Sequence, residues 1–303
     1  MTWFLIALGA PFLWAMVNHI DKYLIVRYGT GTGIRGLITF SALFSVLFLP
    51  VIYLTHPNVL EVANTHKALL ILSGCLYSTA ILFYLYGLNE GETSSVMPVF
   101  QLIPVFGYML GFVILKEHLS FLQLIASLII MIGAIMFSVN INKGHYRFNG
   151  KIFCYIAISS FIFALYEILF KAAALGETFW ISSFWQYCGI FLTGVFFFSL
   201  KGFRTEFLTV FNKGKRAVFS LNILIEILTV GGNLLINYAL MLAPAAMVLL
   251  VESFQPFFVF ILGIVLTLFI PSWGKENLST PNLLKKICGI LIMFIGGYLL
   301  FFP

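Results

Sequence analysis

Polar residues recur along the otherwise apolar segment at 214–241, and their types could bind a solute or carry a proton. Asn222, Glu226, Thr229, Asn233 and Asn237 are spaced 4, 3, 4 and 4 residues apart. In a helix this spacing places all five side chains on one face. Such a stripe indicates either a hydrated cavity or hydrogen bonds between helices. Each such hydrogen bond stabilises helix association by about 0.6–2 kcal/mol. We expect a cavity, with Glu226 as a substrate or proton site.

A second acidic group lies beside a proline. Glu252 precedes Gln255 by three residues and Pro256 by four. Because proline removes the hydrogen bond to the residue four positions back, the carbonyl of Glu252 is freed. A broken helical turn beside a carboxylate is suited to a ligand or a proton. The alternative is a solvated carboxylate at the membrane interface.

Two i, i+4 pairs add further ionisable groups: Asn18 with Lys22, and Glu167 with Lys171. Either lysine could bind an anionic substrate group such as a carboxylate, or Glu167 and Lys171 could form an ion pair within their helix. Three aromatic residues lie close in sequence to the polar positions and are candidate cavity walls: Trp14, Tyr84 and Tyr166.

These residues belong to a chain that is apolar almost throughout. Hydrophobic residues make up 61%, charged residues 9%, and the mean hydropathy is +1.04, whereas a soluble domain has about 25% charged residues. A helix needs about 20 apolar residues to cross a bilayer. The sequence therefore predicts an all-α integral membrane protein with ten transmembrane helices, at about 3–26, 35–54, 68–88, 93–115, 120–140, 150–172, 180–200, 214–241, 245–270 and 284–302.

Several function classes lack a sequence signal. The chain has no nucleotide-binding loop, no convincing Ser, His and Asp order and no Cys or His cluster with metal spacing. We therefore expect no enzyme activity, no cofactor, no metal site and no nucleic-acid partner.

Lysine and arginine are concentrated in alternate loops. Fourteen lie in or beside the odd-numbered loops, whereas the even-numbered loops carry only Lys67, Lys116 and Lys171. Because cytoplasmic loops hold the excess of positive charge, this count places both termini outside the cytoplasm.

The second half of the chain repeats the first. Tyr86, Leu88, Pro104, Phe106 and Gly111 recur 152 positions later as Tyr238, Leu240, Pro256, Phe258 and Gly263, and Lys116–Ser120 recurs as Lys275–Ser279. This predicts two five-helix units, 1–140 and 150–303. An odd number of helices per unit makes the repeats inverted. The repeated Glu117 and Glu276 are expected to be structural, capping the helix that follows each, and Pro104 and Pro256 to kink theirs. Glu167, Glu226 and Glu252 have Asn18, Gly74 and Phe100 as counterparts, so the predicted site is asymmetric.

The paired prolines, glycines and Lys-Glu motifs resemble those of the drug/metabolite transporter superfamily, in its ten-helix EamA-type form, over essentially the whole chain. The resemblance implies a carrier of small metabolites with a cavity lined mainly by helices 1, 3, 4, 6, 8 and 9. It also implies peripheral or homodimer-facing helices 5 and 10, export rather than uptake, and cytoplasmic termini, opposite to the charge count. Four-helix relatives carry a proton-coupled carboxylate where this chain has Trp14 and Phe163.

These features together predict a secondary transporter in a bacterial inner membrane. Its substrate would be a small metabolite, an amino acid or related amphipathic solute, moved by alternating access as the repeats rock around the cavity. Proton coupling through Glu226 and Glu252 is a second expectation. A flippase or another lipid-handling protein, with Lys22, Arg27 and Arg35 at the head groups, is the alternative from a different class.

Overall fold

The computed structural model describes residues 2–28, 33–90, 99–138, 150–213, 216–270 and 280–299. All regular elements among these residues are helical, which confirms the all-α prediction. A helix satisfies its backbone hydrogen bonds internally, as a lipid environment requires. Seven spans are long and apolar enough to cross a membrane, and the shorter apolar helices Leu102–Leu115 and Phe121–Met136 accompany them.

Every predicted transmembrane segment is largely helical where the structure describes it, with interruptions at Gln101 and at Ser253–Phe254. The first half contains α1 (Thr2–Tyr28), α2 (Ile34–Phe44), η1 (Ser45–Leu47), α3 (Phe48–Thr55), η2 (Pro57–Leu60), α4 (Asn64–Glu90), α6 (Leu102–Leu110), η3 (Gly111–Leu115) and α7 (Phe121–Ser138). The second half contains α8 (Gly150–Ala174), α9 (Phe179–Ser199), α10 (Lys201–Lys213), α11 (Arg216–Leu242), α12 (Ala245–Glu252), α13 (Gln255–Phe269) and α14 (Thr280–Leu299).

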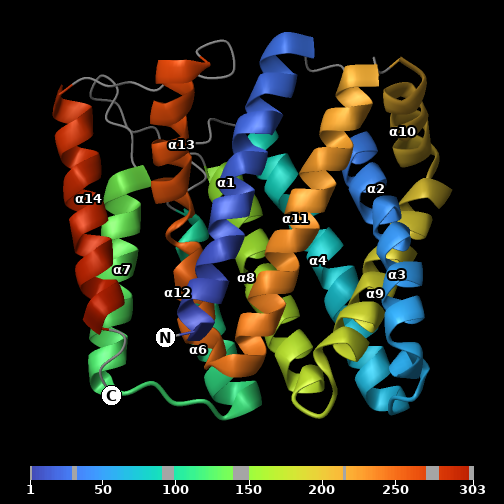
Figure 1. The fold of residues 1–303 in the computed structure, drawn as a ribbon, viewed down its shortest axis with the longest axis horizontal. Helices are drawn as coiled ribbons and strands as arrows, with labels where there is room; N and C mark the ends of the chain where they lie inside the picture. The colour runs from blue at the N-terminus through green and yellow to red at the C-terminus, as the bar shows by residue number, and fades with distance from the viewer. Residues whose placement is uncertain are drawn as a thin grey trace.

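One helix was not predicted. α10 is polar, so a search for apolar runs treats its residues as a loop. It packs against α2 and α9 at the upper right of Figure 1. Its Glu206 carboxylate accepts hydrogen bonds from the backbone N–H groups of Arg35, at 3.1 Å, and Gly36, at 3.3 Å. The side chain thereby caps α2, whose first N–H groups have no partner within their own helix.

The remaining helices form pairs that span the molecule (Figure 1). α1 packs against α11, and α4 packs against α8 and α9. α7 and α14 pair at the left edge of this view, at the periphery, as the resemblance implied for helices 5 and 10.

Glycines allow α7 and α14 to approach closely. A Cβ atom at Gly133 would lie 2.9 Å from the carbonyl oxygen of Gly289, and one at Gly296 would lie 2.9 Å from that of Ala126. Small residues of this kind let two helix backbones meet in a membrane.

The start of α7 differs from the prediction. Ser120 and Gln123 cap it reciprocally: the Ser120 hydroxyl accepts from the Gln123 N–H at 3.2 Å, and the Gln123 side chain accepts from the Ser120 N–H at 3.0 Å. Glu117 instead accepts from the N–H of Ala245, at 2.7 Å, at the start of α12. The expectation that Glu117 caps its own following helix was therefore wrong. Glu276 lies outside the described residues.

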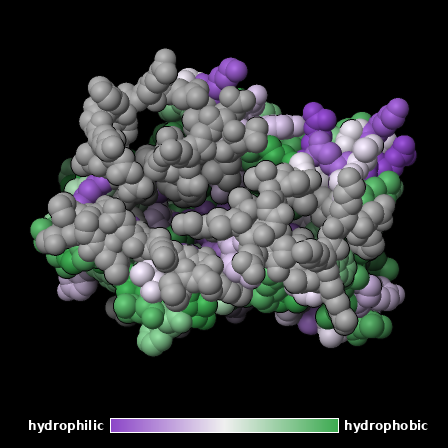
Figure 2. Space-filling model, turned by 90° about the horizontal axis from the view of Figure 1, so that it is seen from above, coloured by the Kyte–Doolittle hydropathy of each residue, from purple (hydrophilic) through white to green (hydrophobic). Residues whose placement is uncertain are grey.

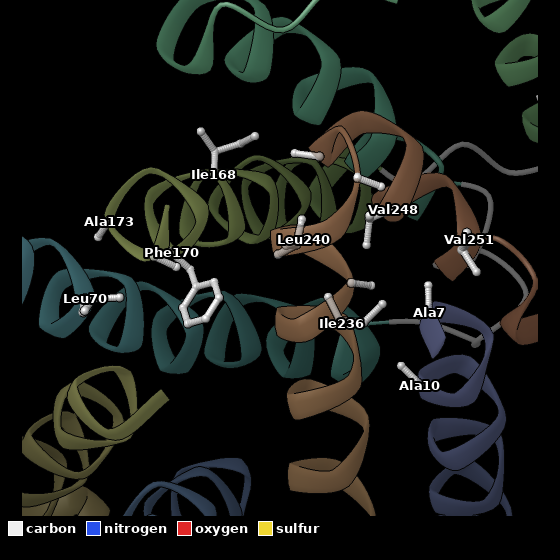
Figure 3. Close-up of a cluster of buried hydrophobic side chains, with 14 residues drawn as sticks. Ala7, Ala10, Leu70, Ile168, Phe170, Ala173, Ile236, Leu240, Val248 and Val251 are labelled. Atoms are coloured by element: carbon white, nitrogen blue, oxygen red, sulfur yellow. The ribbon is translucent and has the colours of Figure 1, made fainter. Parts of the chain in front are cut away.

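The main apolar core lies in the lower half of the bundle. Figure 3 shows its side chains converging from α1, α4, α8, α11 and α12. Phe170, Ile236, Leu240 and Val248 are each 0% exposed. These side chains fill the space between the five helices. Because lipid is as apolar as they are, close van der Waals packing holds them together and not removal from water.

Candidate functional site

A cavity of about 290 Å³ lies between the helices above this core. Its walls come from α1, α2, α4, α6, α8, α11, α12 and α13, and they extend to Leu37 and Asn222 near the upper ends of α2 and α11. Viewed from above, hydrophobic residues occupy much of the described periphery, as expected of helices that face lipid (Figure 2). The volume lies near the lower end of the range of about 300–1,000 Å³ typical of small-molecule sites.

Most candidate residues predicted from the sequence line this cavity. They are Trp14, Asn18, Tyr84, Pro104, Tyr166, Glu167, Asn222, Glu226, Asn233, Glu252, Gln255 and Pro256. They come from helices far apart in the sequence, so the fold brings the three predicted carboxylates into one chamber.

Two described candidates, Asn237 and Lys171, lie outside this lining. Asn237, at the lower end of the polar stripe, is 1% exposed and donates to Gln186 at 2.6 Å. Gln186 in turn donates to Ser73 at 3.0 Å. Asn237 therefore joins α11 to α9 and α4 by interhelical hydrogen bonds, the alternative considered for the stripe. The side chain of Lys22 lies outside the described residues.

Lys171 also lies outside the cavity lining. Its ammonium group pairs with the carboxylate of Glu117 and donates to the carbonyl of Ala243 at 2.5 Å. The ion pair between Glu167 and Lys171 considered above does not form. Through these two contacts Lys171 links α8 to the segment after η3 and to the end of α11, below the cavity.

This pairing closes a four-part contact that we name the lower latch: Glu117, Lys171, Ala243 and Ala245. One carboxylate oxygen of Glu117 pairs with Lys171, and the other accepts from the Ala245 N–H. The lysine side chain is only 6% exposed. The lower latch thus joins the first half of the chain to three helices of the second half.

The carboxylates inside the cavity have different partners. Ser41 donates to Glu226 at 2.8 Å, and the Tyr166 hydroxyl donates to Glu167 at 2.9 Å. Glu167 is 1% exposed. Its carboxyl group also lies within hydrogen-bonding reach of that of Glu252.

The span formed by α12 and α13 is broken beside this pair. α12 ends at Glu252 and α13 begins at Gln255, with Pro256 in its first turn, as expected from the proline. At the break, Ser253 donates to Gln101 at 2.7 Å. Gln101 is the turn residue before α6 and lies 152 positions earlier. Equivalent residues of the two halves thus meet where their helices are interrupted.

Aromatic rings form a continuous wall next to the carboxylates. Ring centroids are 5.1 Å apart for Tyr84 and Phe100, 6.1 Å for Phe100 and Phe163, and 5.8 Å for Phe163 and Tyr166. Tyr77 lies 5.3 Å from Tyr166. These spacings are typical of aromatic pairs in contact.

Sequence reasoning missed several lining residues. α2 contributes Ser41 although no residue of that helix was a candidate, and Tyr77, Phe163 and Gln101 were not chosen as walls. Tyr77 lies seven residues before Tyr84, two helical turns along one face. That spacing was a usable signal, whereas Ser41 offers none because serine is common in membrane helices.

The described residues contain no group of three or more His, Cys, Asp or Glu that could hold a metal ion. What the cavity presents is three carboxylates, several amides and hydroxyls, and an aromatic wall. This combination is suited to holding a small amphipathic solute in a defined orientation.

Comparisons with known proteins were made for sequence and for structure. A solved structure, described only as the crystal structure of a protein, superposes with a TM-score of 0.69 over 98% of this chain and 96% of its own, at 13% sequence identity. A search of the curated proteins finds no match. At this identity the structural likeness shows the fold alone.

A family model gives the more informative result. Residues 1–139 match the EamA-like transporter family, which confirms, for this first half of the chain, the resemblance to the drug/metabolite transporter superfamily inferred from the repeated motifs. Members of this family are transporters and not enzymes. Residues 1–139 are therefore similar to a unit of that family, which suggests a membrane transporter of small solutes. The seven apolar spans among the described residues agree with a multi-pass membrane protein.

Proposed function

We propose that the protein is a secondary transporter that carries a small amphipathic metabolite, an amino acid or a related solute, by alternating access. The observation that carries this proposal is the position of the cavity. Its lining reaches the upper ends of α2 and α11, whereas below it lie the apolar core and the lower latch. A site exposed toward one end and closed toward the other is what one state of such a carrier requires.

Contacts between equivalent positions support the inverted-repeat frame that this mechanism needs. Gln101 and Ser253, 152 residues apart, meet at the two helix breaks. In the α7 and α14 pair, Gly133 approaches Met293, and Gly296 approaches Ile130. The contact between Gln101 and Ser253 is consistent with a two-fold relation between units 1–140 and 150–303, and the paired glycines let α7 and α14 pack closely.

The cavity size favours a small solute over a lipid. A volume of about 290 Å³ is too small for a molecule with two acyl chains. Arg35, one of the residues considered for a lipid head group, lies with its guanidinium 5.6 Å from the centroid of the Phe203 ring and outside the cavity lining. The cavity therefore favours a carrier of small solutes over a flippase.

The test begins with a thermal-shift screen of water-soluble metabolites against the purified protein. Solutes that raise the unfolding temperature are then measured for flux in proteoliposomes. Two variants of α11 make the result specific: Thr229→Trp places a large ring in the cavity wall, and Leu224→Trp places it at an exposed, lipid-facing site. We expect flux to be lost only in Thr229→Trp. Equal flux in both variants would show that solute does not pass through this cavity.

A further inference from the structure

The carboxyl groups of Glu167 and Glu252 are close together in the cavity, where two negative charges would repel each other. Both residues line the cavity, and the two groups lie within hydrogen-bonding reach. Glu167 Oε2 and Glu252 Oε1 are buried and have no hydrogen-bond donor among the described residues. Two ionised carboxylates are both acceptors, so they cannot bond to each other without a proton or a cation between them.

The described lining offers no positive charge to balance them. It contains Glu167, Glu226 and Glu252 but no lysine, arginine or histidine. The closest candidate in sequence, Lys171, is occupied by Glu117 in the lower latch. Burying an ionised carboxylate without a partner costs several kcal/mol, so the pair creates a strong preference for a cationic group.

The remaining walls indicate an organic cation and not a bare ion. The wall of five rings, from Tyr84 through Phe100, Phe163 and Tyr166 to Tyr77, lies beside the pair, and Tyr166 is bonded directly to Glu167. Aromatic faces attract ammonium groups by about 0.5–2 kcal/mol each and bury the apolar part of a ligand. A further acceptor, Asn233 Oδ1, is buried without a partner.

From these observations we propose that Glu167 and Glu252 form the ammonium-binding site of the cavity, and that the transported solute is a small organic amine with an apolar or aromatic body. The inference rests on the proposed function and narrows its substrate class. It disfavours zwitterions such as amino acids, because the described cavity offers their carboxylate no basic side chain.

An amine would bind to the two carboxyl groups in exchange for a proton. In the empty state one proton lies between the two carboxyl groups, which then carry one negative charge together. An ammonium group that binds both carboxylates displaces this proton to water, so one cation enters and one proton leaves. The charge of the site is unchanged by the exchange.

Other ionisable groups face the pair and must be considered in its pH dependence. They are the hydroxyls of Tyr166 on α8 and Tyr77 on α4, and the Glu226 carboxylate on α11. The described lining from α1, α2, α6 and α13 adds amides, a serine, aromatic rings and aliphatic residues but no ionisable group, and α4 adds the Tyr84 hydroxyl. Glu226 is already hydrogen-bonded to Ser41, so the Glu167 and Glu252 pair is the expected proton source.

On the purified full-length protein, the test uses three probes that share a phenylethyl group. Phenethylamine carries an ammonium group, 2-phenylethanol is its neutral counterpart, and phenylalanine is the zwitterion. We expect binding of phenethylamine by calorimetry, and binding at least tenfold weaker for each of the other two probes. The amine should bind more weakly as pH falls, because protons compete for the same pair. Measurement in buffers of different ionisation enthalpy should show about one proton released per amine.

Neutral variants locate the effect. Glu167→Gln and Glu252→Gln should each weaken phenethylamine binding by about 10- to 100-fold, in line with the loss of a charged hydrogen bond, and abolish proton release. Glu61→Gln makes the same change at an exposed position at the lower end and should change neither. Unfolding temperatures establish that each variant is folded. Equal binding of amine and alcohol, an unchanged Kd in both cavity variants, or stabilisation by Na⁺ without amine binding would each overturn the proposal.

This binding experiment is independent of transport. If phenethylamine binds as described but no solute crosses proteoliposome membranes, the proposed transport function fails and the amine site stands. If another solute is carried through the cavity and the amine does not bind, the amine site fails and the transport function stands.

Discussion

Glu117 connects parts of the protein that are distant in sequence through a single side chain. One carboxylate oxygen pairs with Lys171 on α8, and the other caps α12 at Ala245. The capped N–H would otherwise lack a partner, since the first N–H groups of a helix have none within it. Lys171 also donates to Ala243. Each charged group in the lower latch is thereby held by two partners.

Removing one member of the Glu117–Lys171 ion pair should lower the stability of the folded protein. In Lys171→Met the Glu117 carboxylate stays in place without its counter-charge, and breaking a buried ion pair in this way costs about 3–5 kcal/mol. We expect a clear fall in the unfolding temperature in detergent.

The double variant Glu117→Gln with Lys171→Met is the control. It removes both charges. Its loss of stability should therefore be smaller than the sum of the losses in Glu117→Gln and Lys171→Met measured separately. An unfolding temperature for Lys171→Met equal to that of the unchanged protein would show that the pair contributes nothing.

For single residues, the sequence predicts which side chains share a face of one helix, but it does not predict which residues of other helices they contact. The helical spacing on α11 correctly places Asn222, Glu226 and Asn233 on the cavity, yet the same stripe continues to Asn237, which bonds to Gln186 instead. Lys171 was grouped with Glu167 because they are four residues apart. Its actual partner, Glu117, belongs to the other half of the chain, and a single helical period carries no information about such contacts.

Interrupted helices are the distinctive elements of the site. The break between α12 and α13 places Glu252 at a helix end, and the contact between Ser253 and Gln101 joins this break to the start of α6. Pro256 maintains the break because it has no N–H to offer the carbonyl four residues back. A helix interrupted at the cavity can change its angle there while its two halves remain rigid.

Replacing this proline should slow transport without unfolding the protein. Pro256→Ala restores an N–H, and alanine is favoured over proline by about 3 kcal/mol within a continuous helix. We expect the initial rate in proteoliposomes to fall at least tenfold while the unfolding temperature stays the same or rises. Pro50→Ala, at an exposed position on α3, is the matched control and should leave the rate unchanged. A normal rate in Pro256→Ala would mean that the break is not needed for movement.

The elements themselves were largely predictable, and the exceptions have physical causes. Long apolar runs predict membrane helices because the bilayer leaves few alternatives, and Pro256 correctly predicted the interruption of one of them. α10 was missed because it is polar and packs on α2 through Glu206. The cap of α7 was assigned to Glu117 from its position in the repeated motif, whereas the adjacent Ser120 and Gln123 provide it.

The whole molecule has one end that is rich in positive charge. In Figure 1 the polar helix α10, which contains Lys201 and Arg204, lies at the upper end, and Arg35 of α2 contacts it. The cavity lining extends toward this end. By the positive-inside rule we expect this end to face the cytoplasm, and the described state would then be open to cytoplasmic solute.

Cysteine accessibility in cells decides this orientation. In a background without Cys75, Cys154, Cys188 and Cys288, Asn58→Cys on η2 marks the lower end and Thr205→Cys on α10 marks the upper end. Both positions are exposed. We expect a membrane-impermeant thiol reagent to label Asn58→Cys in intact cells, and Thr205→Cys only after permeabilisation. The reverse pattern would support the cytoplasmic termini implied by the family resemblance. The cavity would then receive its solute from outside the cell, and an amine that binds there in this state would be a solute for uptake.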